Sequence, residues 1–200
     1  MWGEIMNSIN GILSKWLEDL EKFSYKDYNE LPDIDLYMDQ VVTFLDKQLA
    51  IFQTSSLDKQ ITSSMINNYV KGEVVSAPIS KKYSREHLAL IQEVCTLKQV
   101  LTIAEVKQVI DERYRKNEVN KDEVFNTFKN LLNEKNREAI ELTRSLLENI
   151  EENDLTALTD LSVSLALTAN AFISISKRLL FLNRLYQQDL ENKKKDKSEE

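Results

Sequence analysis

The chain has 200 residues, 42% hydrophobic and 30% charged, which is the balance of a soluble globular protein with one or two domains. Its formal net charge of −7 argues against indiscriminate binding to nucleic acid. Three glycines and two prolines leave few sites for tight turns and so predict long helices, while the single cysteine, Cys95, excludes an intramolecular disulfide and favours the cytoplasm.

The first 57 residues are predicted to form two helices joined by a loop. Apolar residues at steps of three and four predict an amphipathic helix over 2–23, which we expect to pack on the fold or a partner because its charges do not suit anionic lipid. Pro32 ends regular structure in the loop that follows. A second helix is expected over 35–51, with an inward face made of Leu36, Val41, Phe44, Leu45, Leu49 and Phe52.

A short two-faced helix is predicted after Thr62, which is a good N-cap, with its end near Gly72. Its inner face consists of Met65, Ile66, Tyr69 and Val70. Spacing at i, i+3, i+4 and i+7 places four polar residues together on the opposite face, namely Ser64, Asn67, Asn68 and Lys71.

The segment after this helix is predicted to form a small hairpin. Val74 and Val75 would make one strand, a turn would follow at Pro78, and Lys82 and Tyr83 would return. The region 58–85 is also a basic island, with five basic residues against two acidic ones, whereas 1–57 holds four basic and ten acidic residues. Phosphate attraction is local and screened, so such an island suits contact at one site. Its basic residues are Lys59, Lys71, Lys81, Lys82 and Arg85.

Three further helices are predicted before the C-terminal one. Ser84 opens a helix with a capping pattern, and its buried face is expected to hold Leu88, Ile91, Val94, Cys95 and Leu97. Thr102 and Glu105 form a capping box that starts the next helix. A third helix is predicted over 121–149, with an apolar face made of Val124, Phe125, Phe128, Leu131, Leu132, Ile140 and Leu147.

The last helix is predicted over 154–191, followed by a charged, disordered tail over 192–200. Its uncharged stretch 161–175 is too short to span a bilayer and contains polar residues, so a buried soluble helix is expected. Heptad spacing allows a homodimer through this helix, whereas the width of its apolar stripe allows an intramolecular bundle with 121–149 and 2–23.

Several short segments resemble known families. The segment 65–69 is similar to the DNA-contacting helix of the MerR regulators, with roughly the pattern T-L-R-Y-Y, although the arginine of that pattern is Asn67 here. Segments 74–78, 83–88 and 102–106 resemble the wing and the paired helix of the same domain. More closely, the runs MINNYVK, KKYSREHLALI and LKQVL look like a bacterial family known as domain of unknown function 1836, over about 30–145.

These resemblances imply an all-α protein with a MerR-like winged helix-turn-helix that carries a small β-hairpin wing, and a C-terminal helical bundle with one long helix. The expected divisions are 1–34 for the N-terminal helix and linker, 35–112 for the winged domain, 113–191 for the helical region and 192–200 for the tail. We expect double-stranded DNA to be contacted by Ser64, Asn67, Asn68 and Lys71, and its phosphates by Lys59, Lys81, Lys82 and Arg85.

Enzymatic chemistry has no support in the sequence. The chain has one histidine, His87, and neither a phosphate-binding glycine loop nor a G-x-S-x-G motif. His87 and Cys95 are spaced too far apart on one helix to hold a metal together, so we expect His87 to be a capping or surface residue and Cys95 a core thiol, with no cofactor. Two alternatives stay open: a protein–protein interaction module on the same scaffold, and a sensor whose C-terminal helices hold an effector.

Overall fold

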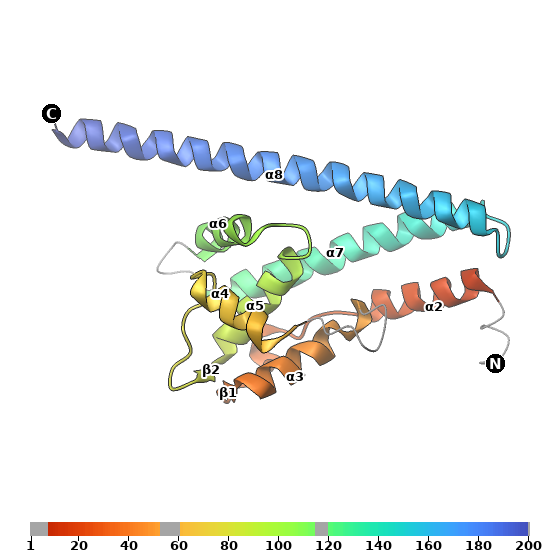
Figure 1. Ribbon diagram of the computed structural model, residues 1–200, viewed down its shortest axis with the longest axis horizontal. Helices are drawn as coiled ribbons and strands as arrows, with labels where there is room; N and C mark the ends of the chain where they lie inside the picture. Colours follow the sequence, from red (N-terminus) through yellow and green to blue (C-terminus); the bar gives the residue numbers. More distant parts are fainter. Residues whose placement is uncertain (1–7, 53–60, 115–119, 200) are drawn as a thin grey trace.

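The computed structural model describes residues 8–52, 61–114 and 120–199 (Figure 1). The described chain is mostly helical with one small antiparallel sheet, so the all-α expectation is confirmed. The elements in chain order are α2 (Ile9–Lys22), η1 (Tyr28–Glu30), β1 (Leu36–Tyr37), α3 (Met38–Leu49), η2 (Ala50–Phe52), α4 (Ser63–Lys71), β2 (Lys82–Tyr83), α5 (Arg85–Leu97), α6 (Ile103–Tyr114), α7 (Lys121–Leu147) and α8 (Leu155–Glu199).

The helix starts that the sequence marks with caps are confirmed. The Thr62 hydroxyl accepts a hydrogen bond from the Met65 N–H at 3.2 Å, and Ser84 forms a capping box with His87. The Thr102 N–H donates to the Glu105 carboxylate at 2.7 Å, and this bond holds the pKa of Glu105 below its usual value. Capping is local chemistry, which is why these boundaries could be predicted.

Helix α5 forms the centre of the main core. The predicted buried face is confirmed for Leu88, Ile91, Val94 and Cys95, but Ala89, Gln92 and Glu93 on its other sides are buried as well. Residues of α3, α4, α6 and the first part of α7 belong to the same hydrophobic cluster. A helix buried all round cannot be recognised from a one-sided apolar stripe.

A second, smaller hydrophobic cluster joins α2 to the far half of α7. It consists of Leu17, Leu20 and Ile140, with Leu13, Phe23, Ile51 and Leu147 packed against it. Packing of the N-terminal helix on the fold is thereby confirmed. The apolar residues whose spacing predicts this helix are Trp2, Ile5, Ile9, Leu13, Trp16, Leu20 and Phe23. Of these, Ile9 and Trp16 are exposed, and residues 2 and 5 lie outside the described chain. Phe52 and Leu131, also expected to face inward, are exposed too.

The two-stranded sheet differs from the predicted hairpin. Strand β2 pairs with β1 in antiparallel register, with Leu36 opposite Tyr83 and Tyr37 opposite Lys82. Residues 36 and 37 are therefore strand rather than the start of a helix, and α3 begins at Met38. The prediction that Val74 and Val75 form the partner strand is wrong, because β1 takes that place and the N–H groups of both valines donate to the Tyr69 carbonyl at the end of α4, at 2.9 and 3.3 Å.

Helix α8 is long and largely exposed, which corrects the expectation of a buried helix. It runs beside α6 and extends past the body, and it continues through 192–199, where disorder was predicted (Figure 1). It is fastened to α6 by a bond from the Gln108 amide to the Leu180 carbonyl at 2.7 Å and by the pair Lys177–Glu105 at 3.9 Å. The uncharged stretch 161–175 is by itself too short to span a bilayer. The longer segment Leu155–Leu190 is, by length and composition, apolar enough to cross a membrane.

Candidate nucleic-acid interface

Helix α4 is anchored by one face and leaves the other to solvent. Ile66 and Tyr69 are buried in the main core, as the spacing predicts. The Tyr69 hydroxyl lies beside the Cys95 thiol of α5. Burial raises the pKa of Cys95 to about 12, so the thiol is a protonated core group, as expected. These contacts fix the rotation of α4 about its axis and therefore decide which side chains face outward.

The outward face of α4 holds the four polar residues that were predicted to share it. Ser64, Asn67, Asn68 and Lys71 are all exposed. In the described part of the chain, none of their side chains has a hydrogen-bond or ion-pair partner. Side chains with donors and acceptors that the fold does not use are available to a ligand. Helix α4 ends at Gly72, its C-cap, whose N–H donates to the Asn68 carbonyl at 2.9 Å.

The segment between α4 and β2 forms a projecting turn. After Val75 the chain leaves the core and turns back at 79–82, where the backbone N–H and C=O of Ile79 and Lys82 bond to each other at 2.9 and 3.1 Å. Ser80 and Lys81 at the tip have φ of 50° and 65°, in the left-handed region. Lys81 is exposed there, and the turn joins directly to β2 (Figure 1).

The four predicted phosphate contacts have different surroundings. Lys81 is exposed, and the Lys82 ammonium lies 5.2 Å from the centre of the Tyr37 ring. Arg85 is engaged internally, because its Nε donates to the Leu31 carbonyl at 3.1 Å and its guanidinium lies 6.0 Å from the Tyr28 ring. A phosphate contact by Arg85 would compete with these bonds. Lys59 lies outside the described residues.

Tyr37 and Ser80 are the two residues of this region that the sequence did not suggest. Tyr37 supports Lys82 from the neighbouring strand, and that pairing joins positions 45 residues apart in the chain. Ser80 and Lys81 form a two-residue turn without the Asn-Gly or Asp-Gly sequence that usually marks one. Neither the pairing of Tyr37 with Lys82 nor the turn at Ser80 and Lys81 can be recognised from the residues next to it in the sequence.

His87 is a buried capping residue. Of its two expected roles, capping is confirmed and a position on the surface is wrong. Its Nδ1 accepts from the Ser84 N–H at 3.1 Å, and its Nε2 lies 3.1 Å from the Ser76 hydroxyl. The ring is buried against Tyr83, with centroids 5.6 Å apart. His87 therefore ties the start of α5 to the segment that leads into the projecting turn.

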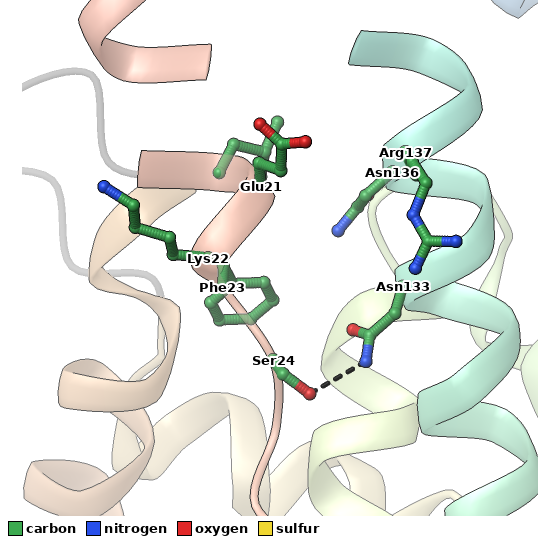
Figure 2. Close-up of a pocket in the computed structure, with 8 residues that line it drawn as sticks. Glu21, Lys22, Phe23, Ser24, Asn133, Asn136 and Arg137 are labelled. Atoms are coloured by element: carbon green, nitrogen blue, oxygen red, sulfur yellow. Dashed lines mark hydrogen bonds between the residues drawn. The ribbon is translucent and has the colours of Figure 1, made fainter. Parts of the chain in front are cut away.

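Two hollows lie away from α4. One, of about 130 Å³, lies between the end of α2 and α7, where the Asn133 amide donates to the Ser24 hydroxyl at 2.8 Å (Figure 2). The Nδ2 of Asn136 is buried beside it with no partner among the described residues. The other, of about 250 Å³, lies between α6 and α8 and is lined by Lys107, Asp111 and Arg184 among others. Both are smaller than the pockets of roughly 300–1,000 Å³ that hold organic ligands.

Residues 26–131 match the family described as domain of unknown function (DUF1836). The chain belongs to this family. The matched region begins before η1 and ends within α7, so it contains α4, the projecting turn and the sheet, but not α8. No protein with a curated description and no solved structure matches the chain.

Proposed function

We propose that this DUF1836 protein is a non-enzymatic transcriptional regulator of the cytoplasm that binds duplex DNA through a MerR-like winged helix-turn-helix. The observation that carries the proposal is the outward face of α4, where Ser64, Asn67, Asn68 and Lys71 are exposed and, within the described chain, unpartnered. A helix that is anchored to the protein by one face can lie in the major groove of DNA, where the polar side chains of its other face contact the base edges.

The order of elements supports the same proposal. Helix α3 precedes α4 and packs against it, and the projecting turn and β2 follow, with β2 held by β1. In a winged helix-turn-helix, a first helix supports the second, and the wing contacts the backbone beside the groove. The exposed Lys81 at the tip of the turn would take that backbone contact in this chain.

Asn67 and Asn68 are the residues best suited to base recognition. An asparagine amide can bond adenine N6 and N7 together, which is worth about 1–3 kcal/mol of discrimination against other bases. Lys71 suits a phosphate or a guanine edge. Because the whole chain carries a formal charge of −7, attraction to DNA is confined to the basic island, and we expect little affinity for unrelated duplexes.

Selection from a random duplex library tests the proposal. We expect one enriched motif, with affinity that falls steeply as salt rises. Asn67→Ala/Asn68→Ala should abolish the enrichment, whereas Asn130→Ala, at an exposed position on α7, should preserve it. Lys81→Ala should weaken binding to all sequences equally and lower the salt slope by about 1. No enrichment, or an enrichment unchanged in the double variant, would exclude base recognition by α4.

A protein–protein interaction module is the second candidate. It is favoured by the internal contacts of Arg85, which leave fewer basic groups for phosphate, and by the acidic net charge. If it holds, affinity capture should return one stoichiometric partner whose binding survives Lys81→Ala/Lys82→Ala. Loss of the partner in that variant would instead indicate that the basic turn is the contact surface.

A further inference from the structure

Helix α8 has apolar side chains on two opposite faces. One face, with Ile173 and Leu180, is half-buried toward α6. With about 3.6 residues per turn, the opposite face passes through 160, 164, 167, 171, 175, 178 and 182. On that open face Leu167, Ile175 and Leu182 are 65%, 57% and 48% exposed. Contiguous apolar surface of this kind marks an interaction site.

The charges along this part of the chain are distributed in two blocks of opposite sign. The segment 148–160 contains five acidic residues and no basic one, whereas 177–184 contains three basic residues and no acidic one. The segment 161–176 between them is uncharged. Of these acidic residues only Asp160 lies within α8, and Asp154 directly precedes the helix. Two parallel copies of α8 would set like charges side by side, whereas two antiparallel copies would set Asp154 and Asp160 of one copy beside the basic residues of 177–184 in the other.

Asp160 and Arg178 define one particular antiparallel register. Both lie on the open face, and neither has an ion-pair partner among the described residues. They are 18 residues apart, about 27 Å along a helix, and their midpoint is Ala169. A two-fold axis that crosses the open face at the height of Ala169 would place each Asp160 opposite the Arg178 of the other copy. The same axis sets Leu167 opposite Ala171, a large side chain against a small one.

We propose that the open face of α8 binds the same face of a second copy in antiparallel orientation, with two Asp160–Arg178 pairs that fix the register. Charged groups within an apolar seam specify orientation at some cost in stability. Leu155–Leu190 is long and apolar enough to cross a bilayer, but Asp160 and Arg178 on the open face would be costly in hydrocarbon and favour a protein partner. In addition, the pair Lys177–Glu105 fastens the other face to the body. This inference does not depend on DNA binding.

Charge reversal tests the pairing by light scattering at micromolar concentration. The wild-type chain, 23.3 kDa, should scatter as a species of twice that mass. Asp160→Arg and Arg178→Asp should each weaken the dimer roughly tenfold or more, because each sets like charges opposite each other twice. The double reversal should restore the wild-type affinity. A monomeric wild type, or a folded double variant that stays monomeric, would overturn the proposal; circular dichroism verifies the fold.

Cysteine cross-linking tests the orientation without changing any charge. In the proposed register Ser164 lies beside Ile175 of the other copy, whereas the two copies of Ser164 are about 15 Å apart along the helices and those of Ile175 about 18 Å, beyond the reach of a disulfide. Under mild oxidation, Ser164→Cys/Ile175→Cys should form a covalent dimer and either single variant should not. Cross-linking of the single variants would show a parallel pair. Flotation of a monomeric wild type with phosphatidylcholine vesicles would show a membrane-binding helix, and either result would refute the antiparallel dimer.

Discussion

Glu93 is a fully buried carboxylate that joins three helices. The Tyr114 hydroxyl of α6 donates to its Oε1 at 2.7 Å, and Arg113 Nε lies 3.4 Å from its Oε2. Arg113 also donates through Nη2 to the Val124 carbonyl of α7 at 2.9 Å. Burial raises the pKa of Glu93 above its usual value, and the bonds from Tyr114 and Arg113 only partly oppose that rise.

Glu93→Gln should remove a pH dependence of stability. Because the pKa of Glu93 is higher in the folded chain than in the unfolded one, the folded state binds more protons, and stability falls as pH rises from about 4.5 through the raised pKa. The variant keeps an acceptor for Tyr114 but cannot ionise. In urea titrations across this window, the free energy of unfolding should therefore fall with pH less in the variant than in the wild type.

The matched control is Glu141→Gln, at an exposed carboxylate on α7. Its unfolding free energy should follow the wild-type pH profile. If Glu93→Gln and Glu141→Gln both run parallel to the wild type, ionisation of Glu93 makes no contribution to the pH dependence.

At the scale of elements, the turn 79–82 has a left-handed backbone that its own residues do not predict. Two L-residues, Ser80 and Lys81, occupy left-handed conformations, each of which costs about 1–2 kcal/mol relative to ordinary backbone. The pairing of β2 with β1 and the bonds between Ile79 and Lys82 hold the turn in place. The sequence predicted a turn nearby, at Pro78, because the fixed φ of proline favours turns. The strand partner, in contrast, is distant in the chain and has no local signal.

Ser80→Gly should stabilise the protein by up to about 1 kcal/mol, since glycine adopts positive φ without strain, although its greater freedom in the unfolded chain offsets part of the gain. Ser145→Gly, at an exposed position within α7, should instead destabilise the protein by about 0.5–1 kcal/mol. Thermal unfolding measures both. Equal destabilisation by the two substitutions would show that the left-handed turn is absent in solution.

At the scale of the molecule, α7 connects two cores. Its first part contributes Phe125 and Phe128 to the main cluster, and Ile140 lies in the cluster with α2. An exposed ion pair, Arg144–Glu21 at 2.7 Å, also joins α7 to α2, but surface pairs of this kind contribute little. Attachment of α2 therefore depends on the apolar contacts around Ile140.

Ile140→Ala should lower the free energy of unfolding by about 2–5 kcal/mol, because the side chain is buried and a cavity would remain. Leu142→Ala, two residues away and exposed, should change it by about 0.5 kcal/mol or less. Urea denaturation compares the two. Similar midpoints would mean that the cluster between α2 and α7 makes no net contribution to stability.

The sequence by itself determined the helices, their caps and the two faces of α4, because N-caps and 3.6-residue periodicity act between neighbours in the chain. Thr62, Ser84 and Thr102 could be assigned for that reason, and so could the outward position of Asn67 and Asn68. Only the tertiary structure decided the pairing of β1 with β2, the burial of Glu93 on a helix enclosed on all sides, and the exposure of α8. Each of these depends on which distant segments meet, and an apolar face has the same sequence pattern whether it packs within the chain or remains open to a partner.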